Sequence, residues 1–406
     1  MPESHDTTIY RAPAVRDAAG LDCRDAAVAV RGGIILAAGP AQRVLADIDQ
    51  GRARQIDLTN TLLTPAMVNA HAHLDLTVLG PVPYGGDFKA WVRHVIDHRP
   101  TDPATIAQAV RRGLSLSRAG GVGTVGDIAA TAAAATARLE AGDEALPGVS
   151  YIEWLGRGER FADLAERSRT QLRDAQRAWT AHGREAGAIR LGLEPHAPYS
   201  TADALYDEAL ALAEAHDLPL CTHLAELRDE MDLLGLGAGD DRADAHPIDW
   251  FAPCLHRRRW LLAHCNHVSD AHLGLLAATE ASVAYCPIAS DYFGHRGHRY
   301  REMLAAGVHV CLGTDSILCQ PADAAQPISI FQQMRYLYRR DGADPDALLA
   351  MATTRGLRAL GLDQRHATLA PHSRARLIGV RFEPHPSRSA LEQALAGDYP
   401  VQCIEN

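Results

Sequence analysis

The stretch that decides the fold is Leu62-Leu63-Thr64-Pro65-Ala66-Met67-Val68-Asn69-Ala70-His71-Ala72-His73. Its apolar run is typical of a buried strand that ends at the two histidines. Side chains two positions apart share one face of a strand, so His71 and His73 leave it on the same side. Two neutral imidazoles placed in this way begin a zinc or iron site. A lone His-x-His pair is more often a pair of surface or core histidines, so the rest of the chain has to decide.

The composition is that of an ordinary soluble globular protein. The chain has 406 residues, of which 47% are hydrophobic and 22% charged. Apolar runs stay well short of the roughly 20 residues of a membrane span. The N-terminus has no basic start followed by an apolar core, so we expect a cytoplasmic protein without a secretory signal. The eight cysteines are scattered without a Cys-x-x-Cys pair, which favours reduced core thiols.

The charge balance bears on the class of partner. The formal net charge is -10, whereas nucleic-acid binding needs an excess of Lys and Arg facing phosphates. We therefore expect a small-molecule substrate and neither a nucleic-acid nor a membrane partner. A homodimer is one candidate assembly.

Short apolar runs alternate with longer helical patterns between residues 61 and 315. The eight predicted strands are Leu62 to His71, Gly121 to Asp127, Val149 to Glu153, Ile189 to Glu194, Leu218 to His223, Trp260 to His264, Ser282 to Cys286 and Val308 to Asp315. Eight βα units in about 250 residues predict an α/β fold, a (β/α)8 TIM barrel, whose chemistry lies at the C-terminal strand ends.

The remaining segments predict a second, smaller unit. Residues 1–60 and 365–406 read as short strands with turns, and we expect them to pair in one composite β-sandwich domain built from both termini. Residues 61–364 then form the barrel. The segment 225–258 is too long for a plain βα connection and is interpreted as a lid or pocket wall.

Four predicted strand ends carry metal-binding side chains. They are His71 and His73 from the first strand, His223 from the fifth, His264 from the sixth and Asp315 from the eighth. Three imidazole nitrogens and a carboxylate oxygen suit zinc or ferrous iron and leave a position for water, which the cation activates to hydroxide. The alternatives are a core histidine at position 264 and a helix N-cap at position 315.

These motifs resemble the amidohydrolase superfamily, and within it the cytosine deaminase-like and TRZ/ATZ chlorohydrolase-like branch. The resemblance spans nearly the whole chain, and the matching segments are 65–73 (Pro-Ala-Met-Val-Asn-Ala-His-Ala-His), 195–200 (Pro-His-Ala-Pro-Tyr-Ser), 222–226 (Thr-His-Leu-Ala-Glu), 263–265 (Ala-His-Cys) and 312–316 (Leu-Gly-Thr-Asp-Ser). It implies one divalent metal, zinc before iron, held by His71, His73, His223 and Asp315.

The same resemblance implies roles for the neighbouring residues. Asp315 accepts a proton from the metal-bound water, and Glu226, three residues beyond His223, passes it to a ring nitrogen of the substrate. His264 hydrogen-bonds the attacking hydroxide, and His196 contacts the substrate. The alternatives are a solvated residue at position 226 and a loop-shaping histidine at position 196.

The number of metals is a separate question. Binuclear members of the superfamily commonly use a carboxylated lysine from the fourth strand as a bridge, and the single lysine of this chain, Lys89, lies elsewhere. A mononuclear site is therefore expected. In the alternative, Glu194 at the end of the fourth strand bridges two metals and His264 becomes a ligand.

Aromatic residues and histidines follow the first and seventh strands. Trp91, Ser290 and His295 are the predicted substrate contacts, beside His196. Such a rim suits a flat heterocycle held by stacking and a few hydrogen bonds. The Tyr-Phe-Gly-His pattern at 292–295 resembles bacterial deaminases of adenosine-type compounds, including aminodeoxyfutalosine deaminases. Arg296 and Arg299 meet a substrate carboxylate in one interpretation and are surface residues in the other.

The favoured function is a metal-dependent hydrolytic deaminase that acts on an amino-substituted heterocycle or nucleoside-like compound and releases ammonia. Glu226 favours deamination, because an amidine needs its ring nitrogen protonated. The second hypothesis is a hydrolase with another leaving group, such as a triazine chlorohydrolase or a cyclic amide hydrolase. The third is a non-catalytic barrel scaffold, which is disfavoured because no ligand is missing.

Overall fold

The computed structural model describes residues 7–49, 53–182, 188–228, 230, 232, 245–321 and 327–405. Residues 229, 231 and 233–244 of the segment 225–258 lie outside the described residues, so the lid stays a prediction. Within the described part of the chain, no helix combines the length and the hydrophobicity needed to cross a bilayer.

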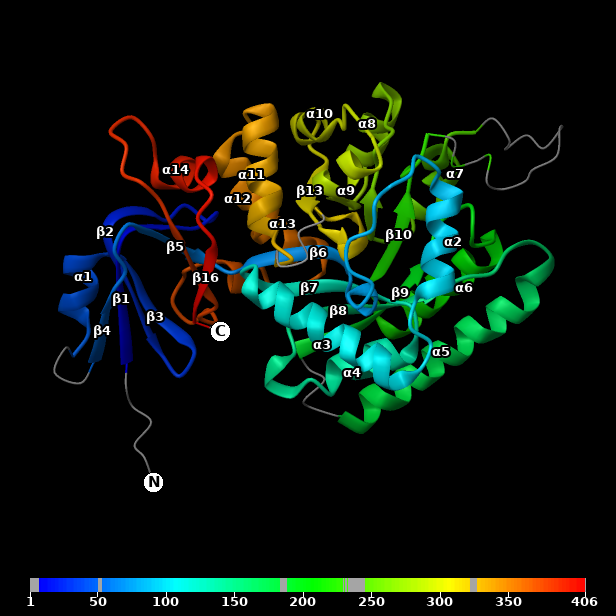
Figure 1. Ribbon diagram of the computed structural model, residues 1–406, viewed down its shortest axis with the longest axis horizontal. Coiled ribbons are helices and arrows are strands. Elements are labelled where there is room, and N and C mark those ends of the chain that lie inside the picture. The colour runs from blue at the N-terminus through cyan, green and yellow to red at the C-terminus, as the bar shows by residue number, and fades with distance from the viewer. Residues whose placement is uncertain are drawn as a thin grey trace.

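A curled parallel sheet of nine strands forms the larger part of the fold (Figure 1). Its order is β13-β12-β11-β10-β9-β8-β7-β6-β14, and its members are β6 (Met67–His73), β7 (Val122–Ala129), β8 (Gly148–Trp154), β9 (Ile189–Pro195), β10 (Leu220–Leu224), β11 (Trp260–His264), β12 (Ser282–Tyr285), β13 (His309–Leu312) and β14 (Asp315–Ser316). β14 follows β13 almost directly in the sequence and pairs with β6. The sheet therefore curls back to its first strand, which is consistent with the predicted barrel.

Helices connect these strands and cover the outside of the sheet. They include α2 (Phe88–His98), α3 (Pro103–Ala119), α4 (Ala132–Leu139), α5 (Phe161–His182), α6 (Asp203–His216), α7 (Pro247–Leu255), α8 (Asp270–Ala277), α9 (Pro287–Tyr292), α10 (Tyr300–Ala305), α11 (Ile330–Asp341), α12 (Pro345–Ala352) and α13 (Thr354–Ala359).

Helix α3 illustrates why these segments are helical. Asp102 caps its N-terminus by accepting a hydrogen bond from the Thr105 N–H, and Pro103 occupies the first turn, where its missing N–H costs nothing. Buried residues then recur at helical spacing, from Ile106 through Val110 to Leu114. The helix consequently presents one apolar stripe to the sheet.

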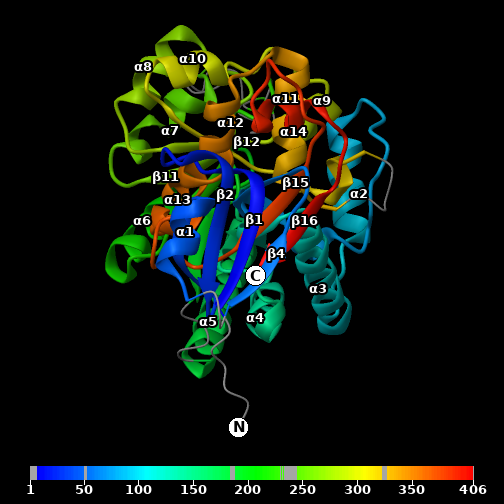
Figure 2. The same cartoon turned by 90° about the vertical axis from the view of Figure 1, so that its left-hand side faces the viewer.

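The two ends of the chain join in one seven-stranded sheet beside the barrel, which faces the viewer in Figure 2. Its order is β16-β15-β5-β1-β2-β3, with β4 on β1, and its members are β1 (Thr7–Arg16), β2 (Asp22–Arg31), β3 (Ile34–Pro40), β4 (Ala53–Asp57), β5 (Thr61–Pro65), β15 (Leu377–Arg381) and β16 (Val401–Glu405). The pairing of both termini was expected. The two-layered sandwich and the domain boundaries at 60 and 365 stay predictions.

The predicted strand from Leu62 to His71 is divided between the two sheets, which corrects that prediction. β5 belongs to the terminal sheet and β6 to the barrel sheet. The chain passes from one sheet to the other between two consecutive residues. The Ala66 N–H donates to the Arg376 carbonyl beside the terminal sheet, and the Met67 N–H donates to the Gly121 carbonyl beside the barrel sheet. Pro65, which has no N–H, closes the first ladder at this point.

Candidate active site

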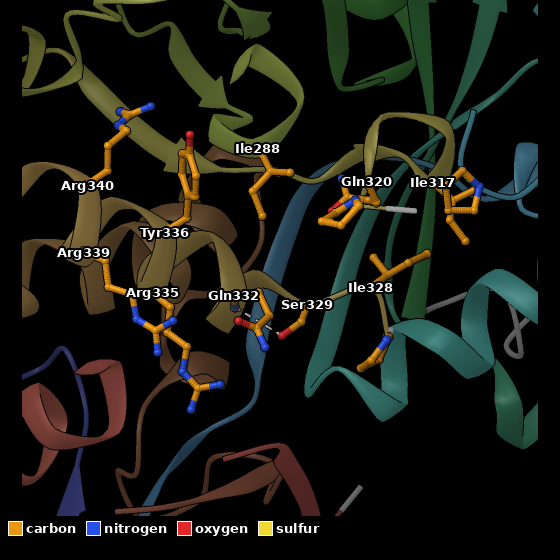
Figure 3. A pocket seen from close by; sticks show the side chains of 13 residues that line it. Ile288, Ile317, Gln320, Ile328, Ser329, Gln332, Arg335, Tyr336, Arg339 and Arg340 are labelled. Carbon is orange, nitrogen blue, oxygen red and sulfur yellow. Dashed lines mark hydrogen bonds between the residues drawn. The ribbon is translucent and has the colours of Figure 1, made fainter. Parts of the chain in front are cut away.

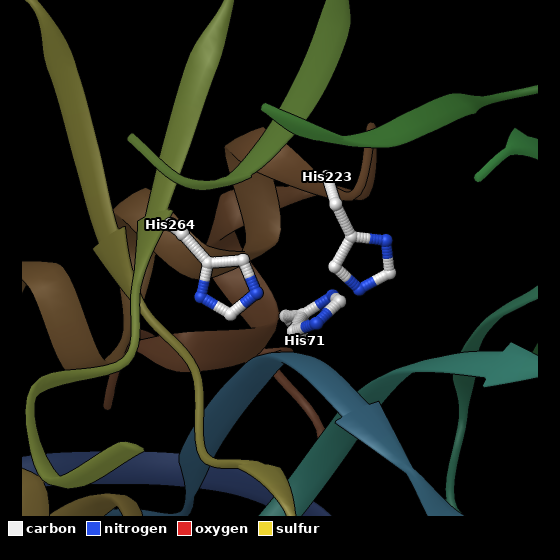
Figure 4. A group of neighbouring side chains, drawn as sticks. All are labelled: His71, His223 and His264. Atoms are coloured by element: carbon white, nitrogen blue, oxygen red, sulfur yellow. The ribbon is translucent and has the colours of Figure 1, made fainter. Parts of the chain in front are cut away.

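Three histidines from three strands converge at the C-terminal side of the barrel sheet (Figure 4). The ring centroid of His71 on β6 lies 4.9 Å from that of His223 on β10 and 5.5 Å from that of His264 on β11. One nitrogen from each ring lies within 4.8 Å of the others. The predicted strand ends thus meet at one point.

Asp315 and His73 complete the cluster from the strand pair that closes the sheet. Asp315 pairs with Ala72 in the parallel ladder of β14 and β6. Its Oδ1 lies 3.4 Å from His73 Nε2 and 3.9 Å from His71 Nε2. Gly313 allows this approach, because a Cβ at that position would lie 2.9 Å from the Cβ of His71.

The donor set fits a divalent cation. His71 is fully buried, and neither of its ring nitrogens has a hydrogen-bond partner among the described residues. Burial lowers the pKa values of His71, His73 and His264 well below the usual range, so their imidazoles are neutral. Burial also acts to lower the pKa of His223, but the adjacent Glu194 carboxylate raises it to about 10. Neutral imidazoles with an adjacent carboxylate are the ligands that zinc prefers, and an unpaired buried imidazole is costly without a ligand of its own.

Glu194 orients His223. Its Oε1 lies 2.7 Å from His223 Nδ1, and the His196 carbonyl oxygen lies 3.1 Å from the same nitrogen. The His196 carbonyl accepts a hydrogen bond from Nδ1 and the Glu194 carboxylate forms an ion pair beside it, so the proton stays on Nδ1 and Nε2 is left for the cluster. Because Glu194 contacts the nitrogen that faces away from the other histidines, its place supports the mononuclear hypothesis over a bridging carboxylate.

Glu226 lies beside the cluster and is only 6% exposed. Its Oε1 lies 3.8 Å from His264 Nε2, and it shares a cluster of possible ligand atoms with His264 and Asp315. Burial raises the pKa of Glu226 to about 7; the nearby His223 opposes this rise and Asp315 adds to it. A buried carboxyl that titrates near neutrality is suited to proton transfer, and its burial contradicts the solvated alternative.

The backbone around these residues is strained. Ala225, His264, Cys265 and Asp315 have φ angles of 50°, 73°, 49° and 60°, in the left-handed region that non-glycine residues avoid. Each such residue costs about 1–3 kcal/mol and persists where its surroundings hold it. The strain is concentrated at three strand ends that carry the predicted chemistry.

A cavity of about 230 Å³ opens from this cluster, and two of the predicted substrate contacts line it. Trp91 lines the cavity together with Phe88, both from α2, and its indole N–H donates to the Tyr292 hydroxyl. His196 is the second, and its Nδ1 lies 2.7 Å from the Ser200 Oγ. The cavity therefore offers an aromatic wall, and His196 adds an imidazole to those of the cluster.

The other two predicted contacts, Ser290 and His295, do not line this cavity. Helix α9 turns the chain directly after β12, so that the Ser290 Oγ donates to the Asn266 Oδ1 at 2.7 Å. His295 Nδ1 lies 3.3 Å from His267 Nε2. Their role as substrate contacts stays a prediction that this placement does not support.

Arg296 and Arg299, the alternative carboxylate contacts, lie in ion pairs outside the cavity. Arg296 pairs with Asp291, and Arg299 Nη2 lies 2.7 Å from Asp270 Oδ1. These contacts agree with the surface interpretation.

The sequence analysis did not single out a charged group on the cavity wall. Arg99 lies at the end of α2, and its guanidinium contacts Asp75 at 3.3 Å and Glu153 at 3.6 Å. Arg99 and Glu153 line the cavity. Glu153 closes the predicted third strand, so its position at a strand end was a usable signal; Arg99 carried none.

A further cavity of about 400 Å³ lies against α11, and the described residues that line it include no histidine (Figure 3). Its charged side chains are used within the fold. Arg335 donates to the carbonyl oxygens of Ala394 and Tyr399, and Arg339 to those of Ala396 and Gly397. These arginines stabilise the C-terminal segment.

Comparisons with known proteins give relatives of this chain and proteins that share its fold. The chain is 29% identical over 372 residues to a 5-methylthioadenosine/S-adenosylhomocysteine deaminase of Desulforudis audaxviator, covering 88% of this chain and 81% of that protein. It is 28% identical over 327 residues to the aminodeoxyfutalosine deaminase of Deinococcus radiodurans, covering 74% and 73%. The fold matches a zinc-bound adenosine deaminase from Xanthomonas campestris with a TM-score of 0.80 and 20% identity, over 99% of this chain and 91% of that one.

A family model supplies the assignment. The model described as "Amidohydrolase family" matches residues 62–400, which is most of the chain and includes the metal cluster and Glu226. The chain belongs to the amidohydrolase family.

Proposed function

We propose that the protein is a metal-dependent hydrolytic deaminase of an amino-substituted heterocycle of the adenosine type, with release of ammonia. One observation carries the proposal: a buried carboxyl, Glu226, lies beside the predicted ligand cluster without belonging to the set of His71, His73, His223 and Asp315. The names of the relatives support it, since both similar proteins are deaminases of adenosine-derived compounds.

The metal is the first requirement. His71, His73, His223 and Asp315 would hold one divalent cation, and we propose zinc. When bound, the cation supplies Lewis-acid activation of a water molecule.

The chain's own residues then move the protons. Glu226, protonated near neutral pH, donates to the ring nitrogen next to the amino group and makes the adjacent carbon more electrophilic. Asp315 accepts the proton that the attacking water loses as its oxygen bonds to that carbon. His264, in contact with Glu226, hydrogen-bonds the new oxygen. Asp315 passes this proton to the amino nitrogen, which leaves as ammonia when the carbon–nitrogen bond breaks. The new hydroxyl loses its proton to Glu226 and becomes a carbonyl, which restores both carboxyl groups.

The cavity positions the ring. Phe88 and Trp91 form an apolar wall on which a flat heterocycle stacks. His196 is fixed through Nδ1 by Ser200, which leaves Nε2 for a polar group of the substrate. We also propose a cytoplasmic enzyme whose partner is this small molecule rather than a nucleic acid or a membrane, and a homodimer as its assembly.

A hydrolase with another leaving group, such as chloride from a triazine or the nitrogen of a cyclic amide, is the second candidate. It would use the same ligands. Glu226 favours deamination, because protonation of the ring nitrogen is the step that an amidine requires.

The test is a screen of the zinc-loaded protein against aminopurines, adenosine-type nucleosides, pterins, cytosine, triazines and cyclic amides, read as ammonia release. We expect ammonia from an adenosine-type compound, and Glu226→Gln should lower its kcat by about 10²–10⁴-fold while one metal per chain is retained. Glu140→Gln, an exposed change, is the matched control. Full activity in Glu226→Gln, or hydrolysis of a ring amide without ammonia, would contradict the proposal.

A further inference from the structure

Glu226 is held by its backbone as well as by its surroundings. Its N–H donates to Glu230 Oε2 at 2.8 Å, and its carbonyl oxygen accepts from Asn266 Nδ2 at 3.1 Å. Both bonds are buried. The peptide groups on the two sides of the Glu226 Cα are therefore fixed independently of its carboxyl.

The contact to Asn266 extends to a third strand end. Asn266 Oδ1 accepts from the Ser290 Oγ at 2.7 Å, and Ser290 is 1% exposed. The direction of the chain of bonds is determined, because a carbonyl oxygen only accepts: Asn266 must turn its NH₂ toward Glu226, and Ser290 must then donate. Segments that follow β10, β11 and β12 are thus linked in series.

The backbone that these bonds hold is strained. Ala225, directly before Glu226, has a φ of 50°, and Cys265, directly before Asn266, has a φ of 49°. Residues in this region revert to ordinary conformations unless fixed contacts oppose it. A loss of either contact would let the Glu226 side chain move away from His264.

We propose that Ser290, Asn266 and Glu230 are positioning residues that hold Glu226 in place for proton transfer, and we call this set the Glu226 clamp. The inference rests on the proposed function, because it assigns the clamp to the step that Glu226 performs. It also gives Ser290 a role different from the substrate contact that the sequence predicts.

The two roles of Ser290 separate in steady-state kinetics. In Ser290→Ala the buried Asn266 Oδ1 loses its partner, so the clamp loosens, and kcat should fall by about 10-fold or more with KM unchanged within about 2-fold. Metal content should stay at the wild-type value. Ser290→Thr keeps the hydroxyl and should restore most of kcat.

The matched control is Ser282→Ala. Ser282 is a fully buried serine on β12 whose Oγ has no hydrogen-bond partner among the described residues. Its substitution should leave kcat and KM unchanged. An equal fall of kcat in both variants, or a rise of KM alone in Ser290→Ala, would overturn the clamp.

A second measurement links the clamp to Glu226. If Ser290 acts through Glu226, Ser290→Ala should have no further effect on kcat in a Glu226→Gln background. An undiminished effect there would overturn the inference. Full activity of Glu226→Gln alone would instead contradict the proposed function, so the two failures are distinguishable.

A substitution that keeps the size of the side chain separates loss of the hydrogen bond from misfolding. Asn266→Asp has nearly the same volume but loses the donor to the Glu226 carbonyl, and it should lower kcat at least as much as Ser290→Ala. Thermal unfolding shows whether each variant is folded. Wild-type kcat in folded Asn266→Asp would also overturn the clamp.

Discussion

Two fully buried side chains on opposite sides of the barrel sheet differ in how their polar atoms are satisfied. Arg138 on α4 donates to the carbonyl oxygens of Val125, Leu146, Pro147 and Val149 and to the Ser150 Oγ, all at 2.7–3.1 Å. His71 at the strand ends has no partner for either ring nitrogen among the described residues. The two are equally buried, at 0% exposure.

This difference in hydrogen bonding distinguishes a side chain that stabilises the fold from one that serves a functional site. A buried group that makes its hydrogen bonds recovers the cost of leaving water, whereas one that does not make them is destabilising unless a ligand satisfies it. Arg138 joins the backbones of β7 and β8 without touching the cavity. The cluster around His71 brings together the donor atoms that would hold a divalent metal.

The largest expected effect comes from substitutions in the histidine cluster, which test its role in function. His73→Ala or Asp315→Asn removes one donor from the cluster, so turnover should become undetectable and bound metal should fall below one equivalent per chain. Metal analysis and ammonia release measure both. Chelation of the wild type should have the same effect, with recovery on addition of zinc. Wild-type activity in either variant would contradict the assignment of the ligands.

The next largest effect comes from substitution of Arg138, which tests its role in stability. Arg138→Met removes the guanidinium hydrogen bonds to four backbone carbonyls and one hydroxyl, and we expect the free energy of unfolding to fall by about 3–5 kcal/mol. Because Arg138 lies outside the cavity, kcat per folded molecule and metal content should stay at wild-type values. Urea unfolding and active-site titration separate the two quantities. A 10-fold loss of kcat without loss of stability would contradict the comparison.

The smallest expected effect concerns Glu230, which has one buried oxygen with a hydrogen bond and one without a partner in the described part of the chain. It therefore tests the comparison of Arg138 with His71 within a single side chain. One of its carboxylate oxygens accepts a hydrogen bond from the Glu226 N–H, and the other has no hydrogen-bond partner among the residues that the structure describes. Burial raises the pKa of Glu230 to about 8. Between its ordinary pKa near 4.5 and about 8 the native state keeps a proton that the unfolded chain releases, so stability falls as pH rises through this window.

Glu230→Gln removes the titratable carboxyl but keeps a side-chain oxygen that can accept a hydrogen bond from the Glu226 N–H. From pH 6 to pH 7 the wild type should lose up to about 1.4 kcal/mol more stability than the variant. Urea unfolding at the two pH values measures the difference, and kcat should be retained. Parallel pH profiles would show that Glu230 is ionised in the native state.

Much of the site was predictable because it lies on regular strands. The period of a strand decides which face a side chain takes, so His71, His223 and His264 could be assigned to one rim before their distances were known. Trp91 and His196 also line the cavity. The family resemblance supplied the role of Glu226.

The sequence analysis failed where the chain leaves the strands. Ser290 and His295 follow β12 through the short helix α9, whose turn directs Ser290 to Asn266 and His295 to His267. Arg99 enters the cavity wall through its contacts with Asp75 and Glu153, which lie far from it in the sequence. Partners of this kind are fixed by tertiary packing, and local periodicity carries no information about them.

The division of the stretch 62–73 between two sheets has a consequence for how the chain folds. Leu62 pairs with Val380, so β5 acquires one neighbour only after a segment far downstream in the sequence has been synthesised. Contacts between such distant segments form slowly. Immediately after this late-pairing strand comes the one that carries His71 and His73. We therefore expect metal capture to follow the synthesis of β15, because the strand that carries the first two ligands comes directly after one that depends on this distant partner.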